Sequence, residues 1–233
     1  MSTVPNAQND VYLELSCQSI RNRGVGSIVG IYSVVNSFIA AGFWISLILK
    51  MGAADVLLIS MVLGGFCVIS LWGGVFVWRL DMQTPCDQPI RFNRARQKVY
   101  VYRFHHAGLD PLSRTAWGVR PAIYDWHNVK AEFCSVYGPM GTGGFVETVT
   151  LAFLEPGTGR VIDRLPFAHG RQQGEMYWAL AQLFMQEGPR ALPIFTRPPR
   201  DWNNETHYFN LARRFAPKVE WPPETDLESK TAH

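Results

Sequence analysis

Asp125, His127 and Asn128 form the densest group of side chains in this chain that could do chemistry. A carboxylate, an imidazole and an amide are residue types that general acid–base catalysis uses. The same composition is also typical of a turn between two strands, where short polar side chains bond the local backbone. We expect the turn, and a membrane enzyme that uses these residues is the alternative.

The residues that could bind a metal or act as a nucleophile do not show the spacing of a known site in this sequence. His105 and His106 are adjacent, so on a strand their side chains would point to opposite faces and could not bind one metal together. The glycine-rich run 138–144 lacks the Lys-Ser/Thr pair of a phosphate loop. No two of the cysteines form a CxxC pair; they stand at Cys17, Cys67, Cys86 and Cys134. We therefore predict no catalytic residue, no metal site and no cofactor.

Arg91, Arg94, Arg96 and Lys98 form a basic cluster. The formal net charge of the whole chain is only +3, which is too small for a DNA-binding face, so we predict no nucleic-acid partner. Basic residues close to a membrane attract anionic headgroups by roughly 1 kcal/mol each. We therefore predict that this cluster contacts anionic lipid, provided that the segment before it lies in a membrane.

Two long uncharged runs precede the basic cluster. They are 24–49 and 56–78, and six residues separate them. At about 1.5 Å rise per residue, a helix over either run is long enough to cross the roughly 30 Å hydrocarbon layer. A cleaved signal sequence would need a shorter apolar core nearer the start of the chain. The pattern therefore predicts a transmembrane hairpin of two helices and a multi-pass membrane protein.

Basic residues on the flanks of the two runs predict the orientation of the hairpin. Arg21 and Arg23 precede the first run and Arg79 follows the second, whereas the connection has only Lys50, offset by Asp55. Positive residues are retained on the cytoplasmic side of a membrane. We therefore expect both termini to be cytoplasmic.

Asn36 is the most conspicuous polar residue within the first run. An amide that faces lipid would lack a hydrogen-bond partner, so we expect Asn36 to face the second helix near Cys67 and Ser70, or a neighbouring protomer. Gly26 and Gly30 form a GxxxG pattern that favours close helix packing. A homo-oligomer formed through the hairpin is therefore an option.

The region after the hairpin predicts strands followed by one helix, which is an α+β arrangement. Apolar alternation and turn residues place strands at 99–105, 119–126, 128–138, 145–155 and 160–167, and an amphipathic helix at 172–187. This order fits a pleckstrin-homology-like barrel closed by its C-terminal helix, by fold analogy. The expected segments are 1–23 before the hairpin, 24–78 for the hairpin, 79–193 for the α+β domain and 194–233 for a Pro-rich extension.

The extension and the aromatic residues raise the question of partners. Residues 202–216 predict a short helix, and the polar end from 222 predicts a flexible tail. Aromatic side chains are common anchors of protein interfaces, although they also fill cores. The candidate anchors are Trp117, Tyr124, Trp126, Trp202 and Tyr208.

The stretch "PCDQPIRFNRARQKVYVYRF", 85–104, together with "WHNVKAEF", 126–133, follows the two apolar runs. In this arrangement the chain resembles an uncharacterised family of proteobacterial inner-membrane proteins that are often encoded near type VI secretion genes and their effectors. The resemblance implies the cytoplasmic membrane of a Gram-negative bacterium and a protein partner, either a secreted effector toxin or a secretion component. It favours a non-enzymatic immunity or accessory protein, and a lipid-sensing or scaffold module that regulates a neighbouring membrane complex is the alternative.

Overall fold

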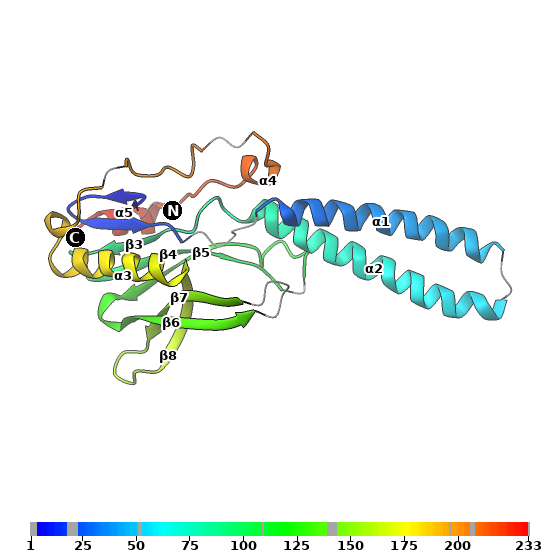
Figure 1. The fold of residues 1–233 in the computed structure, drawn as a ribbon, viewed down its shortest axis with the longest axis horizontal. Coiled ribbons are helices and arrows are strands. Elements are labelled where there is room, and N and C mark those ends of the chain that lie inside the picture. Colours follow the sequence, from blue (N-terminus) through cyan, green and yellow to red (C-terminus); the bar gives the residue numbers. More distant parts are fainter. Residues whose placement is uncertain are drawn as a thin grey trace.

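Two long helices project from one end of a sheet-rich domain (Figure 1). The computed structural model describes residues 4–17, 23–50, 53–108, 110–138, 144–195, 197–205 and 208–232. Helices and antiparallel sheets are segregated along the chain, which is the α+β class that the sequence predicts. Arg21 and the glycine-rich connection at 139–143 lie outside the described residues.

The projecting pair consists of α1, Val25–Ile48, and α2, Ala53–Gln83. Both helices contain a stretch long and apolar enough to cross a membrane, and their large apolar side chains are mostly exposed rather than packed in a core. The two helices approach most closely at Gly30 and Gly74. A Cβ atom on Gly30 would lie 2.7 Å from the carbonyl oxygen of Gly74, so the backbones meet where side chains are missing.

One sheet has five antiparallel strands in the order β1-β2-β3-β4-β5. Their bounds are Ala7–Gln8, Tyr12–Leu15, Ile90–Asn93, Lys98–His105 and Gly118–Asp125. The strands β4 and β5 confirm the sequence prediction, including the edge position of β5, whereas β1, β2 and β3 were not predicted. Because β2 pairs with β3, the hairpin is inserted in the chain between two neighbouring strands of this sheet.

The second sheet has three antiparallel strands in the order β6-β7-β8. Their bounds are Val129–Gly138, Gly144–Leu154 and Val161–His169, and the helix α3, Arg171–Gln186, follows them. These elements match the predicted strands and the predicted amphipathic helix. Strand pairing in the described residues does not join the two sheets, so the pleckstrin-homology-like barrel is not confirmed.

Both sheets and α3 contribute to one hydrophobic core. Alternation along the strands decides which side chains enter it: in β3, Ile90 and Phe92 are completely buried in the core, and Arg91 and Asn93 point to the opposite face. The helix α3 covers the core through Tyr177, Phe184 and their neighbours. The outer face of the first sheet is left for another element to cover.

The C-terminal extension covers that outer face. It follows the short helical turn η2, Pro189–Ala191, and contains the helix α4, Leu211–Arg214, and the helix α5, Pro223–Lys230. The predicted helix over 202–216 is thus only four residues long. The end that was predicted to be flexible is an ordered helix, because Arg91 and Asn93 supply hydrogen bonds to it that local composition does not reveal.

Candidate functional site

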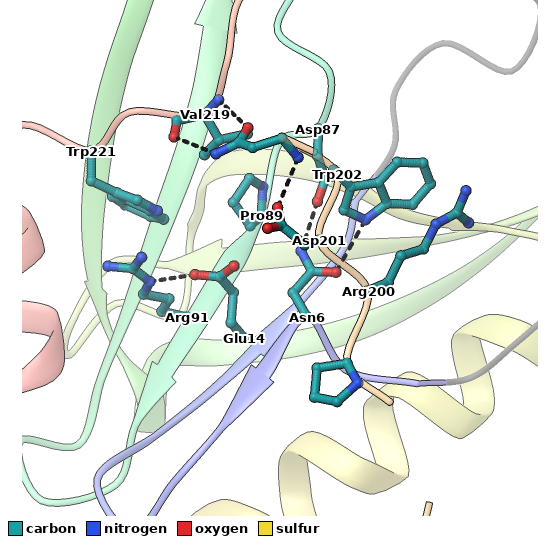
Figure 2. Close-up of a pocket in the computed structure, with 12 residues that line it drawn as sticks. Asn6, Glu14, Asp87, Pro89, Arg91, Arg200, Asp201, Trp202, Val219 and Trp221 are labelled. Carbon is teal, nitrogen blue, oxygen red and sulfur yellow. Dashed lines mark hydrogen bonds and ion pairs between the residues drawn. The ribbon is translucent and has the colours of Figure 1, made fainter. Parts of the chain in front are cut away.

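A polar cavity of about 290 Å³ lies on the outer face of the five-stranded sheet, where the N-terminal strands meet the C-terminal extension (Figure 2). Its walls come from segments that are far apart in the sequence. The side chains that determine its chemistry are Glu14, Asp87, Arg91, Arg200, Trp202 and Trp221. Clefts that combine a few charged groups with aromatic surface are typical of binding sites, and this volume is at the small end of their range.

Asp87 is the buried carboxyl group of this cavity, with 2% of its surface exposed. The Ser16 hydroxyl donates to its Oδ1 at 2.7 Å, and the Asn6 amide donates to its Oδ2 at 2.8 Å. Burial raises the pKa of Asp87 to about 6, although these two hydrogen bonds favour the charged form. Asp87 therefore changes its charge near pH 6, and it holds the N-terminal segment against the sheet.

Arg91 is the cation on the floor of the cavity. Its Nε lies 2.5 Å from Glu14 Oε2, and its Nη1 lies 2.6 Å from Asp226 Oδ1 in α5. Its guanidinium also stacks over the Trp221 ring, 4.4 Å from the ring centre. Arg91 therefore joins β2, β3 and the C-terminal extension.

The wall opposite Arg91 is formed by the extension around Trp202. The indole Nε1 of Trp202 donates to Asn6 Oδ1 at 3.1 Å, so Asn6 links Trp202 to Asp87 (Figure 2). Arg200 lies over the Trp202 ring at 3.6 Å, at the rim of the cavity. Asn203 is bonded to both backbone polar groups of Val219 and so joins two parts of the extension.

The hydroxyl and thiol groups next to this cavity lie in surroundings that do not activate them as nucleophiles. Ser16 donates to a carboxylate with no histidine among its hydrogen-bond partners. The nearby Cys17 thiol is buried, and burial raises its pKa well above the ordinary value, which makes it a poor nucleophile. Among the described residues, no cluster of three or more His, Cys, Asp or Glu side chains has the geometry of a metal site. The Trp221 Nε1 is buried and has no hydrogen-bond partner in the described part of the chain.

A second cavity of about 570 Å³ lies between the N-terminal segment and the loop after α3. Its lining is mostly proline and aliphatic, with Arg190 and Arg197 as its charged groups. Among the described residues that line it, none is acidic. The cavity around Asp87 therefore has the richer recognition chemistry.

The base of the hairpin holds two charged residues whose role the sequence did not reveal. Asp81, near the end of α2, accepts hydrogen bonds from the backbone N–H groups of Gly24 and Ser27 at 2.8–3.0 Å and so caps the start of α1. Arg23 donates in return to the carbonyl oxygens of Thr84 and Pro85, just after α2 ends. Each helix end is thus closed by a residue of the other helix, about sixty residues away in sequence.

The basic cluster is placed differently from the sequence interpretation. Arg96 and Lys98 contact Glu228 of α5, and Lys98 Nζ lies 2.9 Å from its Oε1. Arg91 is buried in its two ion pairs, and Arg94 is exposed. Figure 1 places this part of β3 beside α5, away from the hairpin. Intramolecular carboxylates therefore account for three of the four basic residues without anionic lipid.

Four of the five candidate aromatic anchors make internal contacts. Trp117 packs against Phe76 and under Arg79 of α2, Tyr124 stacks on Phe153 at 3.8 Å, and Trp126 contacts Phe92 and Trp178. Trp202 lines the cavity. Tyr208 is the exposed member of the set.

Asn36 and the Asp125 group have local explanations. The Asn36 Nδ2 donates to the carbonyl oxygen of Tyr32 in its own helix at 2.8 Å, and Ser37, rather than Asn36, is the buried polar residue whose carbonyl oxygen accepts from Cys67. Asp125 to Asn128 form the turn between β5 and β6, in which Asp125 and His127 are exposed. The turn that the composition favours is the observed structure.

The fold and the cavity define an α+β protein with an apolar helical hairpin and a polar pocket at the meeting point of its terminal segments. The chain belongs to a family of unknown function, DUF6708, whose family model matches residues 67–210. The match covers most of α2, both sheets from β3 onward and α3, and it ends before α4. No curated protein and no solved structure matches the chain.

Proposed function

We propose that this protein is a membrane-anchored binding protein, whose hairpin crosses the cytoplasmic membrane and whose α+β domain binds a protein partner. The observation that carries the proposal is the exposed apolar surface of α1 and α2, which stands clear of a domain that buries its own core. A surface of this size is compatible with a soluble protein only if something covers it. A bilayer covers such a hairpin along its full length.

The polar cavity is the proposed contact for the partner. Arg200 and Asp201 lie at its rim, and Glu14 and Arg91 lie within it. A polar side chain or chain terminus of a partner would replace water there and would pair with these groups. The cavity therefore supports recognition of a polar segment by shape and charge.

The resemblance to inner-membrane proteins near type VI secretion genes supplies the proposed partner class. In this proposal both termini are cytoplasmic, and the protein acts as an immunity or accessory protein for an effector or a secretion component. The short connection between the helices, 49–52, offers little surface on the other side of the membrane. The proposal therefore favours a partner that reaches the cytosol or meets the hairpin within the bilayer.

A growth assay tests the proposal directly. Effector genes that neighbour this gene are expressed in a sensitive host with the wild-type protein, with Arg200→Glu, or with Arg160→Glu as a control at an exposed site outside the cavity. We expect protection by the wild type and the control, and weaker protection by Arg200→Glu at an equal amount of membrane-bound protein. Absence of protection against every neighbouring effector would defeat the immunity role.

The lipid-sensing alternative has less structural support. It depends on Arg91, Arg94, Arg96 and Lys98 as a free basic surface, and three of them are engaged with Glu14, Asp226 or Glu228. An ion pair within the domain competes with an anionic headgroup for the same cation. These ion pairs weaken the support for an anionic lipid at this cluster.

A further inference from the structure

The segment 208–215 presents a compact group of exposed apolar side chains. Tyr208, Phe209, Leu211 and Phe215 have exposed fractions from 59% to 103%. Ala212, on the opposite side of the short helix α4, is buried. The segment therefore uses one small side chain to attach to the protein and turns its large apolar side chains outward.

The segment lies at the base of the hairpin. The Asn210 Nδ2 donates to the carbonyl oxygen of Arg23 at 2.7 Å, directly before α1 begins, and α4 contacts α2. Figure 1 shows α4 beside the end of the hairpin that joins the domain. The outward side chains therefore lie near the start of α1, whose first residue, Val25, is also exposed.

Charged residues set the depth of this region relative to a bilayer. Arg79 and Asp81 of α2 are the first charged residues after its long apolar stretch, and Asp81 contacts the first turn of α1. The membrane boundary of a spanning hairpin falls near this level, where Trp78 also lies. Because Asn210 is bonded at the same level, its neighbours Phe209 and Leu211 stand at the headgroup boundary.

We propose that residues 208–215 form an interfacial foot that inserts Tyr208, Phe209, Leu211 and Phe215 into the headgroup and upper acyl region of the bilayer. The inference rests on the proposed membrane anchoring of the hairpin and adds a third, non-spanning contact. Aromatic and aliphatic side chains next to arginine are typical of segments that lie roughly 5–10 Å into this boundary. The exposed Arg214, whose guanidinium lies 5.8 Å from the Phe215 ring, supplies the flanking cation.

The foot would fix the orientation of the domain on the membrane. The hairpin alone is one attachment, about which the domain could tilt, whereas a contact beside it restrains that tilt. The contact comes from residues at and beyond the end of the family match, so the part of the chain after 210 adds to the common domain.

Fluorescence quenching in vesicles tests the foot with the full-length protein. An environment-sensitive fluorescent amino acid replaces Phe209 or, in a second variant, Tyr208. Matched controls carry it at Ile194, which is equally exposed but lines the cavity behind α3, and at Phe38, which is exposed on α1. The vesicles contain a lipid with a nitroxide near the top of its acyl chain or, separately, near the end of the chain.

We expect the shallow nitroxide to quench the probe at 209 and 208 at least about twofold more than the probe at 194. The deep nitroxide should quench the probe at 38, which reports the spanning hairpin. Quenching at 38 combined with equal, weak quenching at 209, 208 and 194 would overturn the foot and leave the membrane anchor intact. The exposed apolar side chains would then be assigned to contact with a protein instead of lipid. Absence of quenching at 38 would instead contradict the membrane anchor itself.

Discussion

Asp81 and Arg23 determine how the hairpin joins the domain. Helix ends leave backbone polar groups without partners, and each of these residues supplies partners to the end of the other helix. Burial lowers the pKa of Arg23, with the nearby Asp81 charge opposing the effect, so the fold tolerates this buried cation because the carboxylate is close. The pair fixes the register of α1 against the end of α2.

Replacement of Asp81 by alanine should destabilise the protein by about 2–4 kcal/mol, because several buried donors of α1 lose one acceptor. Thermal unfolding in detergent micelles measures this change. Asp10→Ala, at an exposed aspartate in the N-terminal segment, is the matched control and should leave the unfolding temperature nearly unchanged. Equal unfolding temperatures for the two variants would contradict the capping role.

The raised pKa of Asp87 predicts that its contribution to the stability of the protein decreases as the pH rises. Its pKa in the folded protein is about 6, above the ordinary 3.8, so the folded state binds the proton more tightly than the unfolded state. This contribution to stability is complete below the ordinary pKa and is lost as the pH rises to about 6. Asp87→Asn removes the titration.

The unfolding free energy of Asp87→Asn, relative to that of the wild type, should therefore rise between about pH 4 and pH 6, by at most roughly 3 kcal/mol. Denaturation in detergent at a series of pH values measures the difference. The comparison with the wild type cancels the titration of the other carboxyl groups. A difference that stays constant across this range would show that Asp87 titrates normally.

Residue contacts of this kind were the least predictable part of the site. The acidic residue at 81 lies beyond the predicted end of the second span, and its partners, Gly24 and Ser27, stand at the start of the first span. Asp87 and Asn6 are likewise far apart in the sequence, and the pairing of β2 with β3 brings them close enough to form a hydrogen bond. Sequence periodicity reports which face of an element is apolar, and it carries no information about which distant polar residue will bond another.

The packing of α1 against α2 depends on where glycines lie along the helices. A Cβ atom on Gly74 would lie 2.9 Å from the Ser33 Cβ and 3.0 Å from the Gly30 carbonyl oxygen, whereas one on the adjacent Gly73 would meet no heavy atom within 4 Å. Gly74 therefore lies at the contact between the helices, whereas Gly73 faces open space.

Gly74→Val should separate the helices and lower the unfolding temperature in detergent, whereas Gly73→Val should have a much smaller effect. Circular dichroism during heating, or protease resistance of the hairpin, measures both. The neighbouring position serves as an internal control for the helix propensity of valine. If the two variants behaved alike, the observed packing of the hairpin would be wrong.

The helix α5 is attached by charge. Burial opposes the charged form of Asp226, but hydrogen bonds and charge from Lys230 and Arg91 outweigh it and lower its pKa. A hydrogen bond from Lys98 is the largest cause of the lowered pKa of Glu228. Both carboxylates therefore stabilise the docked helix above their ordinary pKa values, and this stabilisation is lost as the pH falls through the lowered values.

The double variant Asp226→Asn, Glu228→Gln should release α5 at neutral pH and lower stability by about 1–3 kcal/mol, with a smaller difference in strong acid. Proteolysis at the C-terminal end, followed by mass spectrometry, detects the release. Glu224→Gln alters an exposed carboxylate of the same helix and should leave the cleavage rate unchanged. Cleavage that is no faster in the double variant would contradict docking by charge.

At the scale of elements, the sequence predicted those helices and strands that are determined by their own local residue pattern. The two apolar runs, five strands and the helix α3 follow from hydrophobic period and turn residues. The strands β1 to β3 were missed because they are short and gain their stability from pairing across the hairpin. The helix α5 was missed because its partners, Arg91, Lys98 and Tyr100, are more than a hundred residues away.

The whole molecule has its two terminal segments at the same end of the hairpin. The N-terminal strands pair with β3, and the C-terminal extension covers the outer face of the same sheet. With the hairpin in a membrane as proposed, the partner pocket and the interfacial foot lie on the same side of it.

Extraction of membranes with alkaline carbonate, followed by ultracentrifugation, tests the membrane-spanning hairpin most directly. We predict that the full-length protein remains in the membrane pellet after this treatment and enters the supernatant only when detergent is added, because α1 and α2 expose apolar surface along their length. Recovery of the protein in the supernatant without detergent would contradict the account.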